Sequence, residues 1–235
     1  MTKAVWEKLE EGKVGPEMEY GPLNRAELVE YADAGGDTNP IHQDYVAAVR
    51  AGNKGIISHG LYIHAKLGKM LVDWVGDDNV RAYNGKMVGM TRPQDIIYFK
   101  GIITKKYEKD GEKLVDMDVK ATTKTFYVRG EAKAVDDSLS DEDILKNLEN
   151  GKITVDIDWK IGGERKFNIN LEADGIEINP KRFTGDQALI RDWFREGKDK
   201  LTAEYIKSPR KGKFWFAVVR FRDAITGTAT CAIPE

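Results

Sequence analysis

The chain has 235 residues, of which 41% are hydrophobic and 32% are charged. This length accommodates one large domain or two ordinary ones, with enough apolar residues for a core in either case. The 37 basic and 39 acidic side chains nearly cancel, which argues against a nucleic-acid-binding surface or a polybasic membrane-binding surface.

The cysteine content and the apolar segments indicate the compartment. Cys231 has no second cysteine to pair with, and it lies in an apolar segment, "TATCAIP", that we expect to be a strand. The first residues, "MTKAVWEKLEEGKVG", lack a signal-peptide apolar stretch, and no segment approaches the ~18 consecutive apolar residues of a membrane span. We therefore expect a cytoplasmic protein without a membrane span.

The first part of the chain carries helix signals. "NRAELVEYADAG" has apolar residues on one helical face, Asn24 as an N-cap and a Gly-Gly pair at its end. The Asn-Pro pair that follows predicts a short helix from Pro40 to Arg50. A longer apolar helix is expected from Ile56 to Val75, with small residues that allow another element to pack closely.

The residues from Val80 to Val135 predict a sheet. They form short runs rich in β-branched and aromatic residues, with "EKDGEK" as a hairpin turn and alternation in "LVDMDVKA". We expect at least three antiparallel strands. A long helix followed by such strands predicts an α+β domain in which the sheet wraps round the helix.

The rest of the chain predicts a second, smaller α+β domain. "DDSLSDEDILKNLENG" indicates a linker that runs into a helix capped by Ser140. Three strands, a helix and two closing strands are expected after it, at 153–159, 166–171, 175–178, 186–196, "KFWFAVVRFRD" and "TATCAI". The expected organisation is therefore a first domain over 1–135, a linker and helix over 136–150, and a second domain over 151–235.

Asp37 and His42 are the candidate catalytic residues. A carboxylate and an imidazole held near each other can bind one water molecule and pass protons in both directions. Two glycines precede Asp37, and Pro40 restricts the turn before the histidine. The spacing equally suits a purely structural role, because D-x-N-P is good capping chemistry for the next helix. Spacing alone leaves both interpretations open.

The segment "SHG", Ser58 to Gly60, lies at or just inside the start of the long apolar helix. Amides at a helix start carry partial positive charge and can receive a carbonyl oxygen that gains negative charge. Gly60 would let a substrate approach the backbone, whereas His59 has packing or hydrogen bonding as its simpler role. For His64 we expect a helix position without chemical function.

A metal site is the rival use of the histidines. Asp37, His42 and His59 could supply ligands, but neither H-x-x-x-H nor H-E-x-x-H spacing is present and cysteine ligands are lacking. We therefore expect no metal. The sequence also has no G-x-x-x-x-G-K phosphate loop and no G-x-G-x-x-G after a strand, which argues against a nucleotide-dependent reaction.

The segment "YADAGGDTNPIHQD" closely resembles the hydratase motif of MaoC-like dehydratases and (R)-specific, type 2 enoyl-CoA hydratases. That motif has an aromatic residue, Ala, two variable residues, Ser or Thr, then G-D-x-N-P-aliphatic-H-x-D. "GIISHGL" resembles the family's aliphatic-small-H-G-M/L segment. The resemblance extends to about Val135. It implies a hot-dog fold, an antiparallel sheet wrapped round a long helix, and a homodimer.

The resemblance also implies roles for individual residues. Asp37 and His42 match the pair that activates water, Asn39 the residue that orients the loop, and the Gly60 amide the thioester oxyanion donor. Gly36, Ser58 and His59 are assigned with Asn39 to substrate binding. The match departs from the family pattern at two positions: Gly35 replaces Ser or Thr, and "RPQDII" lacks the usual glycine-aspartate pair after Pro93.

The implied reaction is reversible syn hydration of a trans-2-enoyl thioester to the (R)-3-hydroxyacyl thioester. Its partner is an acyl-CoA or acyl-carrier thioester, no cofactor is implied beyond the CoA of the substrate, and no nucleic acid is involved. The C-terminal part is faintly similar to sterol-carrier-protein-like lipid-binding domains, and a cap or dimerisation domain is the alternative. Two other functions remain open, a hot-dog acyl-CoA thioesterase and a non-catalytic acyl- or lipid-binding protein.

Overall fold

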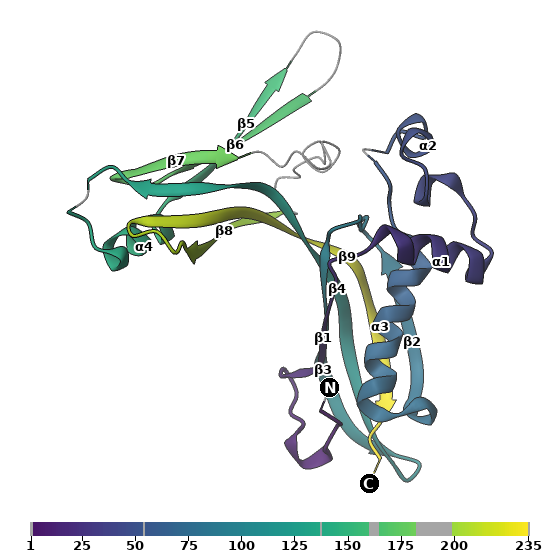
Figure 1. Ribbon diagram of the computed structural model, residues 1–235. Coiled ribbons are helices and arrows are strands. Elements are labelled where there is room, and N and C mark those ends of the chain that lie inside the picture. Colours follow the sequence, from purple (N-terminus) through teal and green to yellow (C-terminus); the bar gives the residue numbers. More distant parts are fainter. Residues whose placement is uncertain (1, 54, 137, 160–164, 182–198, 235) are drawn as a thin grey trace. The chain divides into compact units, whose positions relative to one another are not determined.

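The computed structural model describes residues 2–53, 55–136, 138–159, 165–181 and 199–234 (Figure 1). The chain forms two compact units, Met1–Lys124 together with Arg222–Glu235, and Thr125–Phe221. This division differs from the expected boundaries, because the last strand returns to the first unit instead of closing a C-terminal domain. The second unit is thus an insertion in the sequence of the first. Among the described residues, no helix is long and apolar enough to cross a membrane.

The first unit is built on one antiparallel sheet. Its strands are β1 (Val14–Tyr20), β2 (Val80–Met87), β3 (Ile96–Lys109), β4 (Glu112–Ala134) up to Lys124, and β9 (Lys213–Ala232) from Arg222 onward. They lie in the order β1-β3-β4-β9-β2. β2 therefore pairs with β9 and not with β3, as in the register Tyr83 opposite Ala229. The expected hairpin is confirmed, with Lys109 opposite Glu112 across the Asp-Gly turn.

The first unit contains three α-helices and three 3-10 turns among its described residues. They are the 3-10 turn η1 (Trp6–Lys8), α1 (Arg25–Gly35), the 3-10 turn η2 (Pro40–His42), α2 (Tyr45–Arg50), α3 (Gly60–Val75) and the 3-10 turn η3 (Asp77–Asn79). Figure 1 shows α3 lying along one face of the sheet, with α1 and α2 near its N-terminal end.

Two helices differ from their predicted bounds. The helix expected over residues 40–50 is divided, because Asp44 accepts the N–H of Ala47 at 2.7 Å and so caps α2 as a separate helix. The long helix begins at Gly60, because residues before it make bonds that a helix cannot: the Ser58 N–H donates to the Thr91 carbonyl at 2.8 Å. Both shifts place His42 and His59 at the ends of elements instead of inside helices.

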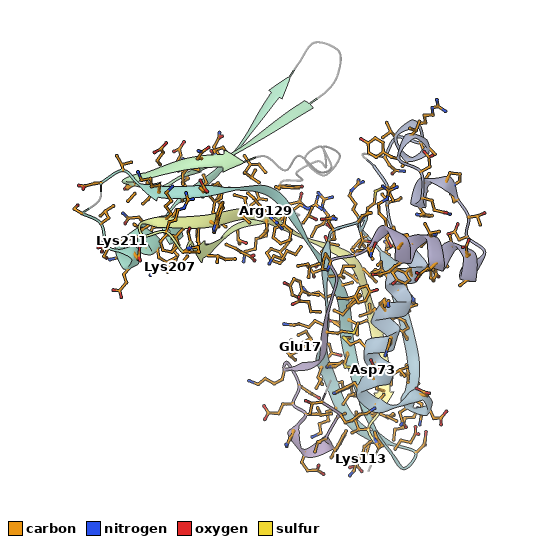
Figure 2. All side chains as sticks on the ribbon, in the orientation of Figure 1. Glu17, Asp73, Lys113, Arg129, Lys207 and Lys211 are labelled. Atoms are coloured by element: carbon orange, nitrogen blue, oxygen red, sulfur yellow. The ribbon has the colours of Figure 1, made fainter. Side chains whose placement is uncertain are left out.

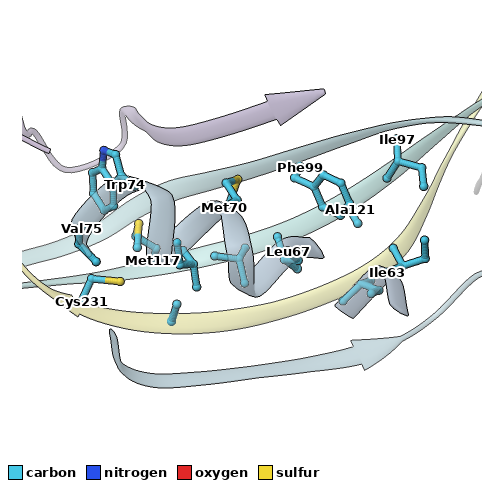
Figure 3. Packing of buried hydrophobic residues seen from close by; sticks show 14 of the residues in the cluster. Ile63, Leu67, Met70, Trp74, Val75, Ile97, Phe99, Met117, Ala121 and Cys231 are labelled. Atoms are coloured by element: carbon cyan, nitrogen blue, oxygen red, sulfur yellow. The ribbon is translucent and has the colours of Figure 1, made fainter. Parts of the chain in front are cut away.

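The core of the first unit lies between α3 and the sheet (Figure 3). The helix contributes buried residues at a spacing of three or four, and the strands contribute every second residue, as helical and strand periodicity require. Each such fully buried side chain stabilises the fold by ~1.5–3 kcal/mol. The main contributors are Ile63, Leu67, Met70 and Trp74 from α3, Ile97 and Phe99 from β3, and Val115, Met117, Val119 and Ala121 from β4. Cys231, in the predicted strand, closes this core.

The opposite face of α3 is solvated. Lys69 and Asp73 form an exposed ion pair of 2.6 Å at a spacing of four residues, and Asp73 is labelled in Figure 2.

An antiparallel sheet that wraps a long central helix is the hot-dog fold. The fold predicted for the first domain is therefore confirmed, with β9 as the strand that completes it.

The second unit contains one described helix and several strands. The helix α4 (Asp141–Glu149) is followed by β5 (Lys152–Trp159), β6 (Arg165–Glu172), β7 (Ile176–Lys181) and β8 (Lys200–Lys207). β7 pairs with the second part of β4, β8 with the first part of β9, and β5 with β6 as a separate two-stranded sheet. The three strands expected over residues 153–178 are thereby confirmed. The helix expected over residues 186–196 lies outside the described residues.

Ser140 caps α4 as predicted, and the cap is reciprocal. The Ser140 hydroxyl accepts the N–H of Asp143, and the Asp143 carboxylate accepts the N–H of Ser140, both at 3.2–3.3 Å. The helix then buries Ile144 and Leu148 against the core of the second unit. This unit also buries Arg220 completely, and its guanidinium donates to the hydroxyls of Thr125 and Tyr127 at 2.9 Å.

Candidate active site

The loop after α1 is shaped by short-range hydrogen bonds. Gly36 ends the helix in a left-handed conformation, φ 71°, which favours glycine. The Asp37 carboxylate then accepts the N–H of Asn39 at 3.4 Å, and the Asn39 side chain accepts the N–H of Ile41 at 3.3 Å. Pro40 follows as the first residue of η2. Asn39 thus orients the loop, whereas Gly36 acts as a helix terminator.

Gly35, where the sequence departs from the hydratase motif, is the last residue of α1. A β-carbon built at this position meets only the Tyr31 ring, at 3.6 Å, which is ordinary van der Waals contact. Its φ is not in the left-handed region. The backbone here therefore does not require glycine, and a serine would fit.

His42 is held in one tautomer by the backbone. It is 8% exposed, and its Nδ1 lies 2.8 Å from the Ile57 carbonyl oxygen. Because a carbonyl can only accept, Nδ1 carries the hydrogen, and in the neutral imidazole Nε2 then carries the lone pair. That lone pair lies 3.8 Å from Oδ2 of Asp37, whose side chain is 50% exposed. The structure therefore brings the predicted pair together, with a basic nitrogen beside a solvated carboxylate.

His59 contacts both members of this pair. Its Nε2 lies 3.0 Å from the backbone carbonyl of Asp37, and its ring centroid is 3.9 Å from that of His42 with an interplanar angle of 31°. The residue is 1% exposed, and its Nδ1 has no hydrogen-bond partner among the described residues. His59 is thus part of the wall of the site, which spacing in the sequence did not indicate.

Behind His59 lies an aromatic cluster that sequence reasoning missed. The Tyr31 ring is 5.0 Å from His59 and 5.0 Å from Tyr62, and the Tyr62 hydroxyl donates to Glu27 at 2.9 Å. The Tyr20 hydroxyl also donates to Glu27. Burial, followed by its bonds to Tyr20 and Glu27, raises the pKa of the Tyr62 hydroxyl above its ordinary value. These contacts fix α1 against α3, and only the position of Tyr31 in the motif gave a signal for them.

The start of α3 offers a free amide beside the histidines. Gly60 is the first helical residue, so its N–H has no carbonyl partner within the helix. The side chain of Met87 packs directly against the α-carbon of Gly60. Ser58, predicted to bind substrate, is buried and its hydroxyl donates to the His59 carbonyl at 3.3 Å. Gly60 keeps its predicted position, whereas the Ser58 hydroxyl is engaged with the backbone.

The segment "RPQD" forms a hydrogen-bonded turn directly before β3. The buried Asp95 carboxylate accepts the Arg92 N–H at 2.9 Å, and the Arg92 guanidinium donates to the Gly55 carbonyl at 3.3 Å. Between them Gln94 has φ 77°, a conformation that glycine adopts without strain. Of the expected glycine-aspartate pair the aspartate is therefore present, and Gln94 takes the place of the glycine.

His64 lies outside this site. It stacks on Tyr83, with ring centroids 4.4 Å apart, and packs against Gly85 of β2. Burial lowers its pKa from the ordinary value of 6.5. This position, on the face of α3 that meets β2, gives His64 a packing role.

Asp37, His42 and His59 are the residues in the described part of the chain whose ligand atoms lie within 4.8 Å of one another. The planes of the two imidazole rings are tilted by 31°. His42 Nδ1 and His59 Nε2 already contact backbone carbonyls, so His42 Nε2 and His59 Nδ1 are the ring nitrogens that could contact a ligand.

A central helix in an antiparallel sheet, with an Asp/His pair beside a helix start, makes the first unit a hot-dog domain with a candidate acid–base site. Residues 10–125 match the family described as MaoC like domain. The match ends at the border of the two units, and the strand β9 lies beyond it.

Known proteins similar to the chain cover it in part. It is 36% identical over 73 residues to the fatty acid synthase beta subunit TOXC of Cochliobolus carbonum, which is 30% of this chain and 4% of that protein. It is similar to the structure of an (R)-hydratase from A. caviae involved in PHA biosynthesis, with 16% identity, a TM-score of 0.43, and 50% and 87% of the two chains covered. It is also similar to the structure of an R-hydratase from Pseudomonas aeruginosa, with 19% identity and a TM-score of 0.44. That similarity covers 50% of this chain and 74% of the other.

Proposed function

We propose that the protein catalyses reversible syn hydration of a trans-2-enoyl thioester to the (R)-3-hydroxyacyl thioester. The observation that carries this proposal is the Asp37–His42 pair, in which Nδ1 of His42 contacts the Ile57 carbonyl and Nε2 lies 3.8 Å from the carboxylate. The match of residues 10–125 to the MaoC-like family supports it.

The pair accounts for both proton movements of the reaction. A separation of 3.8 Å is too long for a direct hydrogen bond, but one water molecule can contact both groups. As the water oxygen adds to C3 of the substrate, Nε2 of His42 accepts its proton, and that proton is then delivered to C2 from the same side. Asp37 orients the water and stabilises the imidazolium that forms. Such acid–base catalysis typically contributes ~10²–10⁴-fold.

The Gly60 N–H is assigned to the thioester oxygen. Addition of water at C3 places negative charge on that oxygen, and a free amide at a helix start is suited to receive it. One donor of this kind typically contributes ~3 kcal/mol. The reaction needs no electron transfer, and we propose that it proceeds without a metal or a redox cofactor. The CoA or carrier protein is then part of the substrate.

The experiment that tests the function mixes the purified protein with crotonyl-CoA and follows two signals. Loss of the enoyl absorbance without release of a free thiol supports hydration, whereas thiol release identifies a thioesterase. Tight binding of the acyl-CoA without turnover identifies an acyl-binding protein. Either of the last two results would reject the hydratase assignment.

The roles of the pair are tested by Asp37→Asn and His42→Ala. Asparagine preserves the oxygen that accepts the Asn39 N–H, so the loop is expected to keep its shape. Each variant should lower turnover by at least ~10²-fold with an unchanged circular dichroism spectrum. His64→Ala is the matched control, because this histidine lies against β2, outside the site. Full activity in both test variants would refute the assignment.

The oxyanion role of the Gly60 amide is tested by comparing Gly60→Pro with Gly60→Ala. Proline removes the N–H, and it is tolerated at the first position of a helix. His59 already has ψ 126°, which a residue before proline prefers. Both variants require Met87 to move, so alanine controls for that displacement. We expect turnover of the proline variant to fall ~10²-fold below that of the alanine variant. Equal activities would show that the amide does not bind the oxyanion.

A further inference from the structure

We propose that His59 is a positioning residue, which holds Asp37 and His42 in their reactive arrangement through two separate contacts. Its Nε2–H donates to the Asp37 backbone carbonyl at 3.0 Å, and its ring contacts the His42 ring, with centroids 3.9 Å apart and planes tilted by 31°. This inference rests on the hydratase reaction proposed above and names the residue on which the geometry of that site depends.

The hydrogen-bonding state of His59 indicates that the Nε2–H donor is required. Because its partner is a carbonyl, Nε2 carries the hydrogen and Nδ1 carries a lone pair. That Nδ1 is buried and has no hydrogen-bond partner among the described residues. A buried acceptor left unpaired costs ~1–3 kcal/mol, a cost that a phenylalanine at this position would avoid. The histidine therefore carries this penalty while its other nitrogen holds the Asp37 backbone.

The ring contact with His59 limits the rotation that the hydrogen bond of His42 leaves open. The bond from Nδ1 to the Ile57 carbonyl sets the direction of that nitrogen, but the ring can still rotate about this direction. Contact with the His59 ring sets the plane of the imidazole and hence the direction of the Nε2 lone pair. His59 is held in turn by the Tyr31 ring at 5.0 Å.

The same residue sets the other half of the pair. Asp37 lies in an exposed loop, and the hydrogen bond from His59 to its carbonyl ties that loop to the residue that precedes α3. Without this bond, the contacts of the Asp37 carboxylate with described residues would be the Asn39 N–H at 3.4 Å and Nε2 of His42 at 3.8 Å. A misplacement of about 1 Å at a reacting centre can lower a rate ~10²-fold. Loss of either His59 contact should therefore lower kcat strongly and change KM little.

The test separates the two contacts by two substitutions. His59→Gln preserves a donor near the position of Nε2 but removes the ring, whereas His59→Phe preserves the ring but removes the donor. His64→Gln and His64→Phe, which lie in the helix that follows His59, are the matched controls. We expect both His59 variants to lower kcat at least ~10-fold with KM changed less than ~3-fold, and both controls to retain kcat. An unchanged kcat in either His59 variant, or a raised KM alone, would overturn the proposal.

A second measurement does not depend on turnover. Hydrogen exchange of the amides of Asn39 and Ile41 reports how firmly the Asp37 loop is held. We expect this exchange to be faster in His59→Phe than in the native protein and to be restored, at least in part, in His59→Gln. Unchanged exchange in His59→Phe would overturn the proposal. If the native protein does not hydrate crotonyl-CoA, the hydratase assignment fails, while this measurement still decides the role of His59. Should the phenylalanine variant not fold, kcat in His59→Gln against His64→Gln decides it, and equal kcat values would overturn the proposal.

Discussion

Gln94 lies in a turn whose backbone conformation is costly for its side chain. Its φ of 77° is in the left-handed region, where a β-carbon crowds the following carbonyl oxygen. Its N–H donates to the Leu23 carbonyl at 2.8 Å, and Leu23 in turn donates to the Asp95 carbonyl at 2.9 Å, so the turn cannot relax without breaking these bonds. We predict that Gln94→Gly stabilises the protein.

The magnitude follows from two opposing terms. A non-glycine residue in the left-handed region costs ~1–2 kcal/mol. Glycine gains conformational freedom in the unfolded chain, which offsets ~0.5–1 kcal/mol of the relief. The Gln94 side chain is exposed, so its removal loses little packing. The net expectation is an increase of ~0.5–1 kcal/mol in the free energy of unfolding, or about 1–4 °C in Tm.

Urea denaturation followed by circular dichroism measures this change. Gln94→Ala is the control, because alanine removes the same side chain but retains the β-carbon and its strain. The control is expected to unfold at the native urea concentration, and the glycine variant at a higher one with the same slope. If Gln94→Gly is no more stable than Gln94→Ala, the strain inferred from the backbone conformation is wrong.

Three further predictions concern single side chains. Gly35→Ala should raise the free energy of unfolding by ~0.5–1 kcal/mol through helix propensity, whereas Gly36→Ala, at φ 71°, should lower it; urea denaturation distinguishes the two. Burial lowers the pKa of His64, so the unfolded chain takes up its proton first, and stability from this group is lost as pH falls below 6.5. His64→Gln should therefore lose less stability than the native protein between about pH 7 and pH 5, and equal losses would contradict the burial argument. Burial raises the pKa of the Cys231 thiol to about 12, so a disulfide reagent should modify it in urea but not in the native state, and rapid native modification would exclude a buried thiol.

The parts of the fold that sequence predicted are those determined by neighbouring residues. Asn24 and Ser140 cap their helices as expected, because a cap needs only a side chain and an amide two or three residues away. The Asp-Gly turn between β3 and β4 is equally local. The Asp37–Pro40 turn, and with it the approach of Asp37 to His42, belongs to the same class.

The features that sequence missed depend on residues far apart in the chain. The start of α3 at Gly60 is set by bonds from residues 57 and 58 to Ile41 and Thr91. The contact of His59 with Asp37 spans 22 residues, and the network of Glu27 with Tyr62 spans 35. A periodic pattern predicts that such residues are buried, but not which partner they meet. The approach of Asp37 to His42 could therefore be predicted, whereas the contacts that hold the two side chains in place could not.

The border between the two units differs from the expected domain boundary for a related reason. The pairing of β4 with β9 explains how the first unit can contain two separate segments of the chain. β4 and β9 are neighbours in the sheet, and at the border of the first unit they are tied together by side chains: the Thr122 hydroxyl donates to the Asp223 carboxylate at 2.6 Å, and the Thr123 hydroxyl to the Arg222 carbonyl at 3.1 Å. Antiparallel neighbours of this kind can be joined by a hairpin of two residues. In the sequence, the second unit stands where such a hairpin would connect the two strands. An insertion whose two ends lie side by side costs the host fold little additional loop-closure entropy. A long insertion at this position therefore leaves the pairing of β9 with β2 intact. Local sequence patterns do not indicate that the last strand returns to the sheet of the first unit.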